Sequence, residues 1–498
     1  MKEILSINLG QCGIQVASCF WEIFFNSLRK RHDDQAAALE EVQSFVYHPD
    51  IDLPCRNGLT EPLDSLVSKL RARCILVDTD LGTISEIMQR KQLCHIDGEN
   101  IICGTEATGN NWCTAYFNYG PQYHDAIEDL FATNLETCDE SFQYFNLTFG
   151  LSGGTGGGLG SYILDMLNDS YGKIHRICNV ITQDSMAAVS PYNTLFCLKH
   201  LSEMGTMTNL FSNEALLRQT SQSTAAILRE STKNIPNKEA GFNAENALIS
   251  THMKEIGLAT VSNRYPGFNM SSILNTLIPF PGPNLMCPSM VPKHFTKEPV
   301  TTEALINELL RPSNRISPIP PKVKTFPMAM AIHADFDSSS LKYIKRLKLR
   351  HNMIGWMRDA AQISLPGAFA QDTLTDKPKG MYGIIHDCSI SSFLLSAISN
   401  FERLYAKKAF LHHFSDTLDT EDFTLARDHI TALQNDYTDI SKYMVPPHRL
   451  LDEKSVASLG VKLKKVSDSQ CRDPWNTVPG HLESNKRHWW DLNGRPLL

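Results

Sequence analysis

The 498 residues are 42% hydrophobic and 20% charged, which is typical of a globular protein of two to four domains. The formal net charge of −7 argues against a nucleic-acid-binding protein, and no apolar run reaches the roughly 18 residues of a membrane span. The thirteen cysteines include no C-x-x-C pair, so we expect reduced thiols in the cytosol or nucleus rather than a disulfide framework.

Four short apolar runs before residue 185 predict strands, and helical patterns lie between them. The runs are Ile4–Leu9, Cys74–Val77, Phe145–Phe149 and Ile177–Ile181. Alternation of strand and helix indicates a parallel α/β sheet, and ligands of such sheets bind at the carboxyl ends of the strands. We therefore expect functional residues directly after these runs.

The residues after the first two runs suit a phosphate ligand and its cation. Gly10–Gln15 makes a glycine turn into a helix, and Asp78-Thr79-Asp80 places two carboxylates on one side of an extended chain. Two such carboxylates can hold Mg²⁺ through water, although turn formation is the alternative role for them. The segment Gly109–Trp112 follows the next element and predicts another loop at the same edge.

The glycine-rich stretch Ser152–Gly160 is the most informative motif of the chain. It lies between a predicted strand and a helical pattern at Tyr162–Leu167, where amides at a helix start can cradle a phosphate. It lacks the Lys-Ser or Lys-Thr of a Walker loop and the spacing of the dinucleotide fingerprint. A flexible glycine linker is the alternative, but the flanking patterns favour a nucleotide site.

Beyond residue 215 the sequence predicts a second α/β layer and a helical end. Pro-rich segments at 279–292 and 312–327 precede strands at Met328–Ile332 and Tyr382–Ile385, and a later helix carries an apolar stripe from Phe423 to Ile440. We expect domains at 1–215, 216–397 and 398–451, followed by a tail at 452–498. Three of the six tryptophans lie in that tail, which is either disordered or a docked, partner-binding segment.

These motifs, in this order, resemble the tubulin family over residues 1 to about 445. Gly10–Gln15 is similar to its N-terminal phosphate loop, and Ser152–Gly158 to its glycine-rich signature, with Ser152 for the first glycine and Gly157 for the serine. The resemblance implies an α/β fold: a Rossmann-type parallel nucleotide-binding domain, a second α/β domain and C-terminal helices. The epsilon class is the most similar, through Cys19–Glu22, Gly109–Trp112, Ser190–Asn193 and His412-His413.

The resemblance also implies a guanine nucleotide, GTP or GDP, with Mg²⁺. By this resemblance, Gln11 and Cys12 contact phosphate and metal-bound water, and Asp78 and Asp80 lie near the metal. The β- and γ-phosphates are contacted by Asn110, Gly153, Gly154, Thr155, Gly156 and Gly157. The base is contacted by Asn213, Phe242 and Asn246. Phe242 could instead pack in the core. Ser190 stands where most tubulins have glutamate, and a hydroxyl accepts from a ribose more weakly than a carboxylate.

The implied partners are other tubulin subunits and centriole or basal-body proteins, in the cytoplasm and cytoskeleton. In alpha-tubulin a glutamate acts on the nucleotide of the neighbouring subunit, but the matching loop Phe268–Asn275 contains no acid and an ungapped match puts Ser272 at that position. We therefore expect no catalytic residue there and at most a weak, assembly-dependent GTPase. A delta- or zeta-like tubulin with other partners and a free-standing GTP-dependent enzyme are the alternatives.

Overall fold

The computed structural model describes residues 2–29, 42–49, 63–88, 95–138, 142–183, 187–222, 242–265, 267–292, 302–334, 361–364 and 380–442. The predicted tail at 452–498 lies outside these ranges.

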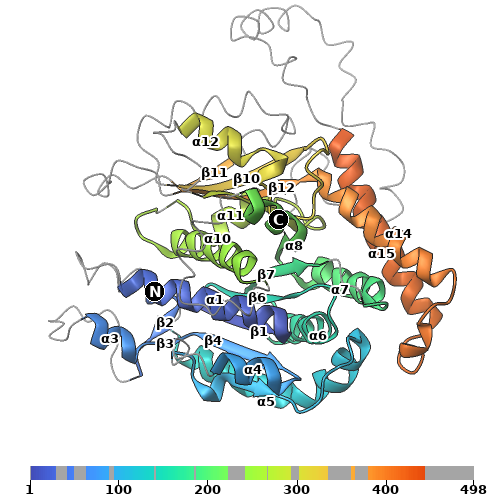
Figure 1. The fold of residues 1–498 in the computed structure, drawn as a ribbon, viewed down its shortest axis with the longest axis horizontal. Coiled ribbons are helices and arrows are strands. Elements are labelled where there is room, and N and C mark those ends of the chain that lie inside the picture. Colours follow the sequence, from blue (N-terminus) through green and yellow to red (C-terminus); the bar gives the residue numbers. More distant parts are fainter. Residues whose placement is uncertain are drawn as a thin grey trace, which may run out of the picture.

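A mixed sheet of ten strands runs through the described part of the molecule (Figure 1), in the order β11-β10-β12-β9-β8-β7-β6-β1-β4-β5. The strands are β1 (Ile4–Leu9), β4 (Cys74–Asp78), β5 (Ile101–Cys103), β6 (Tyr144–Gly150), β7 (His175–Thr182), β8 (Met207–Ser212), β9 (Leu285–Pro292), β10 (Pro327–Ala334), β11 (Ala361–Ile363) and β12 (Gly380–Asp387). Neighbours in the run β9-β8-β7-β6-β1-β4-β5 pair in parallel, whereas β12 is antiparallel to both β9 and β10. The predicted α/β class is therefore confirmed. The short strands β2 (Val46–Tyr47) and β3 (Arg71–Ala72) form a separate pair.

Helices cover both faces of this sheet. They are α1 (Gly10–Arg29), α3 (Leu63–Lys69), α4 (Leu81–Met88), α5 (Gly120–Glu136), α6 (Gly154–Tyr171), α7 (Ser190–Met204), α8 (Asn213–Gln222), α10 (Asn243–Val261), α11 (Met270–Leu277), α12 (Thr302–Leu309), α14 (Ser391–Tyr405) and α15 (Thr420–Lys442). Alternate residues of each strand point to opposite faces. Accordingly, Cys74 and Leu76 of β4 enter the core beneath α1, α4 and α10, while Ile75 and Val77 enter the core beneath α5, α6 and α7.

Helix α10 lies parallel to α1 and crosses the molecule. The Ser250 hydroxyl donates to the Val16 carbonyl of α1 at 3.2 Å, and further along α10 Gly257 packs against Phe45, whose ring contacts Phe20 of α1. Since α1 begins at the carboxyl edge of the sheet, α10 begins there too. Its 19 residues span about 28 Å, so it carries the chain to the opposite edge, where α11 follows.

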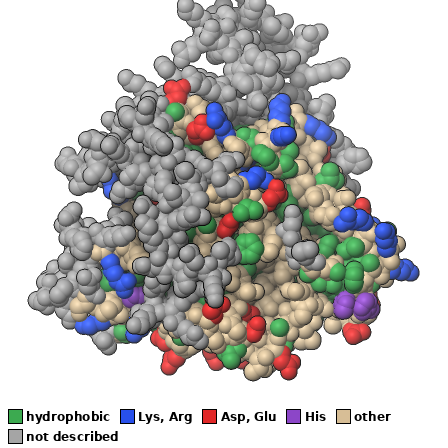
Figure 2. Space-filling view, in the orientation of Figure 1, with side chains coloured by type: hydrophobic (Ala, Val, Ile, Leu, Met, Phe, Trp, Pro, Cys, Tyr) green, Lys and Arg blue, Asp and Glu red, His purple; other side chains and the backbone are tan. Residues whose placement is uncertain are grey.

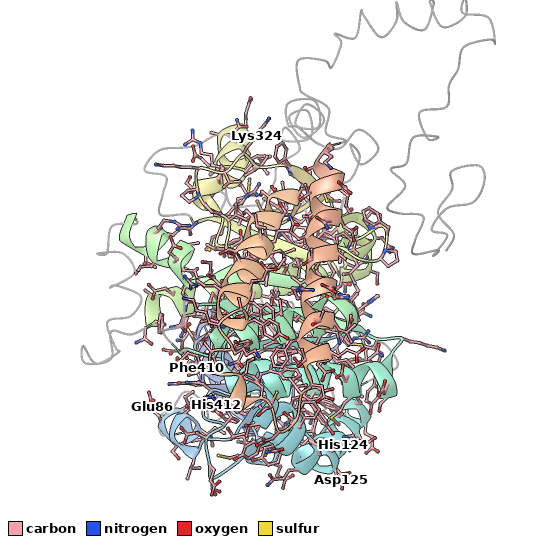
Figure 3. All side chains as sticks on the ribbon, turned by 90° about the vertical axis from the view of Figure 1, so that its right-hand side faces the viewer. Glu86, His124, Asp125, Lys324, Phe410 and His412 are labelled. Atoms are coloured by element: carbon pink, nitrogen blue, oxygen red, sulfur yellow. The ribbon has the colours of Figure 1, made fainter. Side chains whose placement is uncertain are left out.

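The two C-terminal helices lie side by side against α7 (Figure 3). The predicted apolar stripe is confirmed, because Phe423, Ala426, Ile430 and Tyr437 are all buried. The Tyr437 hydroxyl accepts from the Leu285 amide of β9 at 3.0 Å, which ties α15 to the sheet. The expected boundaries at 215 and 397 fall within α8 and α14, and the division into domains stays a prediction.

Candidate functional site

The carboxyl ends of the parallel strands share one edge of the sheet, and most of the predicted site residues lie there. Gly10 follows β1, Thr79 and Asp80 follow β4, Ser152–Thr155 follows β6, and Asn213 follows β8. Across the sheet these strands lie in the order β4, β1, β6, β7, β8. A ligand on this edge therefore meets the acids at one end and Asn213 at the other, with the glycine-rich segment between them.

The glycine-rich segment is mostly helix rather than loop. We expected the helix from about Tyr162, but α6 begins at Gly154, with extended Gly153 as its N-cap. None of the glycines from 153 to 160 has a positive φ angle. They are needed for close packing instead: a Cβ added at Gly154 would lie 2.5 Å from the Asn111 nitrogen, and one at Gly158 would lie 2.5 Å from the Trp112 carbonyl oxygen.

The N-terminus of α6 faces the turn that follows β1. Gly10 has a φ of +64° and packs so closely that an added Cβ would lie 2.9 Å from the Gly156 nitrogen. The first turn of α6 contains no acidic residue, and its N-cap Gly153 has no side chain. Its leading amides therefore present positive dipole ends toward the strand-end turns, which is the arrangement that binds a phosphate.

Asp78 and Asp80, at the end of β4, stabilise the turn there, and Asp78 has one oxygen left to bind a ligand. Asp78 Oδ1 accepts from the amides of Thr79 (2.8 Å) and Asp80 (3.4 Å), and Asp80 Oδ1 accepts from Gly82 at 3.0 Å. Asp78 Oδ2 is buried and has no hydrogen-bond partner among the described residues. Burial raises the pKa of Asp78 from 3.8 to about 6. A cation bound beside Oδ2 would relieve this unfavourable burial.

The remaining predicted phosphate contacts differ in exposure. Gln11 is exposed, whereas Cys12 is half-buried with its Cβ close to Gly150. Burial raises the pKa of the Cys12 thiol to about 12, so the group is neutral and can act only as a weak donor. Asn110 is exposed and adopts a left-handed conformation with φ of 57°.

Asn193 of α7 holds these loops together and was missed as a site residue. Its side-chain nitrogen donates to the carbonyls of Asn110 (2.7 Å) and Ser152 (3.1 Å), and its Oδ1 accepts from the Trp112 amide at 3.1 Å. The Trp112 indole donates to Ser161 of α6 at 3.1 Å. Asn193 lies in the Ser-Pro-Tyr-Asn motif, so the signal was present, but its structural role needed the fold.

The loop after β5 also reaches the C-terminal helices. The Asn111 side chain donates to the His413 carbonyl at 2.6 Å, and the Tyr192 hydroxyl donates to the Ala409 carbonyl at 2.7 Å. His413 lies in the corner that joins α14 to α15, where Figure 2 shows a histidine patch and Figure 3 labels Phe410 and His412. The rings of His412 and His413 lie 4.1 Å apart.

The predicted base contacts lie at the other end of the edge. Phe242 is 45% exposed and is the N-cap of α10, and its carbonyl accepts from the Asn246 amide at 2.8 Å. The two residues are therefore one helical turn apart, as expected. Asn246 is buried, and no hydrogen bond joins its side chain to another described residue. Ser190 is also buried, and its hydroxyl has no partner in the described part of the chain.

The loop that was expected to lack an activating acid lies at the opposite edge. Asn269 caps α11 by accepting from the Ser272 amide at 2.8 Å, which makes Ser272 the third residue of that helix. Ser271 beside it is exposed, whereas Ser272 is half-buried.

Two absences bear on cations and membranes. In the described ranges, no three or more His, Cys, Asp or Glu side chains gather as metal ligands. A cation at Asp78 would therefore take most of its ligands from water and phosphate. None of the described helices combines the length and apolar character that crossing a membrane requires.

Comparison with known proteins finds similarity to one family. Residues 3–221 match the family described as Tubulin/FtsZ family, GTPase domain. The human tubulin epsilon chain is 23% identical over 487 residues, covering 92% of this chain and 100% of that protein. The tubulin gamma chain of Candida glabrata is 27% identical over 463 residues (88% and 93%), and the tubulin alpha-3 chain of Saccharomyces cerevisiae is 25% identical over 466 residues (88% and 98%).

Proposed function

The chain belongs to the tubulin family, with a GTPase domain at residues 3–221, and we propose that it is an epsilon-like tubulin that binds GTP with Mg²⁺ and assembles with other tubulin subunits. The epsilon assignment is supported by similarity to the epsilon chains of human and mouse, at 23% and 24% identity. A delta- or zeta-like tubulin with the same nucleotide site remains the alternative within the family.

One observation carries the nucleotide proposal: the loops after β4, β5, β1 and β6 converge on the N-terminus of α6. Close packing requires the glycines there, because a Cβ added at Gly154 or Gly10 would lie only 2.5 Å or 2.9 Å from a neighbouring backbone nitrogen. A helix N-terminus enclosed by four loops, with a buried and unpartnered carboxylate oxygen nearby, suits a phosphate chain with a bound cation.

Magnesium would be held through Asp78 and Asp80. Asp78 Oδ2 has the burial and the missing partner that a cation-bound water would satisfy, and Asp80 adds a second carboxylate. A bound Mg²⁺ would supply positive charge that neutralises the phosphates. Asp78 would hold the cation near the end of β4, and the backbone amides at the start of α6 would bind the phosphates.

Assembly would be head to tail. The sheet edge with the proposed nucleotide site and the opposite edge with α11 lie at the two ends of α10, about 28 Å apart along that helix. A contact between two different surfaces repeats along a filament instead of closing into a dimer. In such a stack α11 faces the nucleotide of the next subunit, and its exposed Ser271 and half-buried Ser272 offer no carboxylate there. We therefore infer that this chain does not activate hydrolysis on that neighbour.

The nucleotide proposal is tested by competition binding with the purified full-length chain. A fluorescent GTP analogue should bind and be displaced by GTP or GDP, but not by a hundredfold excess of ATP. Asn246→Ala should weaken binding roughly tenfold, the value of one hydrogen bond to the base. Asn275→Ala, at an exposed position on α11, is the matched control and should bind normally. Equal displacement by ATP, or normal binding by Asn246→Ala, would contradict the proposed base contacts.

We further propose a role at centrioles or basal bodies, because of the resemblance to the epsilon class. The test is a tagged full-length chain imaged in ciliated cells with a centriole marker. Enrichment at centrioles above the signal of a similarly tagged alpha-tubulin supports the role, whereas uniform incorporation along cytoplasmic microtubules argues for a different class of tubulin.

A further inference from the structure

Three threonine hydroxyls meet at the acid end of the site. Thr155 Oγ1 of α6 lies 3.1 Å from Thr79 Oγ1, which follows β4, and 3.0 Å from Thr108 Oγ1, in the loop after β5. Thr79 and Thr108 are 0% and 5% exposed, and Thr155 is half-buried. The cluster thus joins three strand-end segments through side chains that the sequence places 76 and 47 residues apart.

The cluster has hydrogen-bonding capacity that the protein does not use. Three hydroxyls carry three protons, and the two oxygen–oxygen contacts consume two of them. The third proton has no acceptor among the residues that the structure describes, since no other hydrogen bond involves these hydroxyls there. A buried donor without an acceptor is unfavourable, so the geometry suits an added acceptor, such as an anionic phosphate oxygen.

The position of the cluster indicates which phosphate it would contact. It lies on the β4 and β5 side of the sheet, while the predicted base contact Asn213 follows β8, four strand steps from β4. Thr79 is also flanked in sequence by the two acids proposed for Mg²⁺. If the base lies toward β8, the phosphate that reaches the threonines is the one furthest from the base.

We propose that Thr79 and Thr108, together with Thr155, recognise the terminal phosphate of a nucleoside triphosphate and make the site prefer triphosphate over diphosphate. This inference rests on the proposed guanine nucleotide function and adds two specificity-determining residues to it. If the hydroxyls only held the loops together, their removal would weaken triphosphate and diphosphate binding equally. If they recognise the terminal phosphate, their removal weakens triphosphate binding alone.

The experiment measures affinities for a non-hydrolysable GTP analogue and for GDP, with Mg²⁺, in full-length Thr79→Val and Thr108→Val variants. Valine keeps the shape of threonine and removes the hydroxyl. We expect at least one variant, the one whose hydroxyl donates to the phosphate, to lose tenfold or more in affinity for the triphosphate, and less than twofold for GDP. Thr260→Val, a buried threonine at the far end of α10 whose hydroxyl donates to the Gly257 carbonyl, is the control and should change neither affinity.

The outcomes separate this inference from the function on which it rests. Failure of the wild-type chain to bind either guanine nucleotide overturns both. Normal wild-type binding with an unchanged triphosphate-to-diphosphate ratio in both variants overturns the threonine assignment alone. Equal losses for both nucleotides also overturn it, because they indicate that the hydroxyls only hold the loops in place. Thr79→Ser and Thr108→Ser should retain the preference, since serine restores the hydroxyl.

Discussion

The side-chain amide of Asn193 donates a 2.7 Å hydrogen bond to the main-chain carbonyl of Asn110, which holds the loop after β5 against α7. The same side chain also bonds Ser152 and Trp112, and it is fully buried. One residue of α7 therefore fixes the positions of two loops that border the proposed phosphate end of the site.

Asn193→Leu should loosen both loops at once. Leucine fills a similar volume but leaves two carbonyls and one amide without partners, so we expect a loss of about 3 kcal/mol in unfolding free energy. Urea denaturation measures this loss, and titration at a temperature where both proteins are folded should show weaker nucleotide binding. The matched control is Asn275→Leu, which should change neither quantity. Unaltered affinity in a destabilised Asn193→Leu would separate this residue from the nucleotide site.

Gly154 and Gly153 form a natural pair for testing the close-packing argument. A Cβ at Gly154 would lie 2.5 Å and 2.6 Å from backbone atoms of Asn111 and Asn110, whereas a Cβ at Gly153 would meet nothing within 4 Å. Gly154→Ala should therefore abolish nucleotide binding or folding, while Gly153→Ala, at a φ of −78°, should be tolerated. Thermal unfolding and nucleotide titration check both variants. Equal behaviour of the two would show that the glycines serve some other purpose.

Asp78 should make stability depend on pH. Its pKa is raised to about 6 by burial, so between pH 4 and 6 the folded chain keeps a proton that the unfolded chain releases, and stability falls as the pH rises. Two pKa units correspond to about 3 kcal/mol. Without divalent cations, the unfolding free energy of Asp78→Asn should therefore exceed that of the wild type by up to about 3 kcal/mol above pH 6. This difference in stability should vanish near pH 4.

Denaturant titrations from pH 4 to 8 compare the two proteins. Adding Mg²⁺ with nucleotide should shrink the difference, because a cation stabilises the ionised carboxylate. A stability difference that is the same at every pH, or one that Mg²⁺ leaves unchanged, would argue against an ionised Asp78 beside the cation.

The buried ion pair of Arg315 and Asp387 should contribute strongly to the stability of the fold around β12, which ends at Asp387. Both side chains are fully buried. Burial raises the pKa of Asp387, but Arg315 and hydrogen bonds from Ser389 and Phe326 outweigh it and hold that pKa below its ordinary value. Asp387→Ala leaves the Arg315 charge buried without a partner and should lower the unfolding free energy by about 3–5 kcal/mol. The double variant Arg315→Met with Asp387→Leu removes both charges and should be destabilised less than Asp387→Ala alone, as measured by urea denaturation. A larger loss of stability in the double variant would refute this explanation.

A carboxylate introduced on α11 should activate a neighbouring subunit. Ser272→Glu places the acid at the position expected from the sequence, but there it can also reach back to the cap at Asn269, as glutamate does three residues after a cap. Ser271→Glu at the exposed neighbouring position avoids this competition. GTP turnover in mixed assemblies with wild-type tubulin should rise with either variant and should increase with protein concentration. Low turnover in both variants would remove the idea that a missing acid limits hydrolysis.

The strands that the sequence predicted are the ones with continuous apolar runs, such as β1 and β6. Four strands of the same sheet, β5, β8, β9 and β11, were missed, and β5 and β11 have only three residues each. In β8 polar Thr208 and Asn209 interrupt the apolar pattern, although both side chains are buried within the sheet. They point to opposite faces, and Asn209 lines a cavity beside His252 of α10. In β9 proline at 288 argued against a strand, yet it lies beyond the two residues that pair with β8, where a missing amide is tolerated.

Within the candidate site, the residues that the sequence predicted mostly belong to contiguous motifs, and their ligand contacts stay predictions. Thr79, Thr108 and Asn193 were missed because their roles depend on partners 41 or more residues away, which no local pattern reveals. The start of α6 was misplaced for a related reason. Glycine disfavours helix when judged locally, but contacts with the loop after β5 leave room for nothing larger, and this requirement of packing overrides propensity.

The bond from Asn111 to the His413 carbonyl joins residues 302 positions apart. Chains emerge from the ribosome with the amino end first, so the loop after β5 leaves the ribosome long before its last support has been translated. The proposed nucleotide pocket is consequently completed late in synthesis, when the corner between α14 and α15 has emerged. A nascent chain truncated before that corner carries every residue that we propose to contact phosphate, but its loop after β5 still lacks the hydrogen bond to His413.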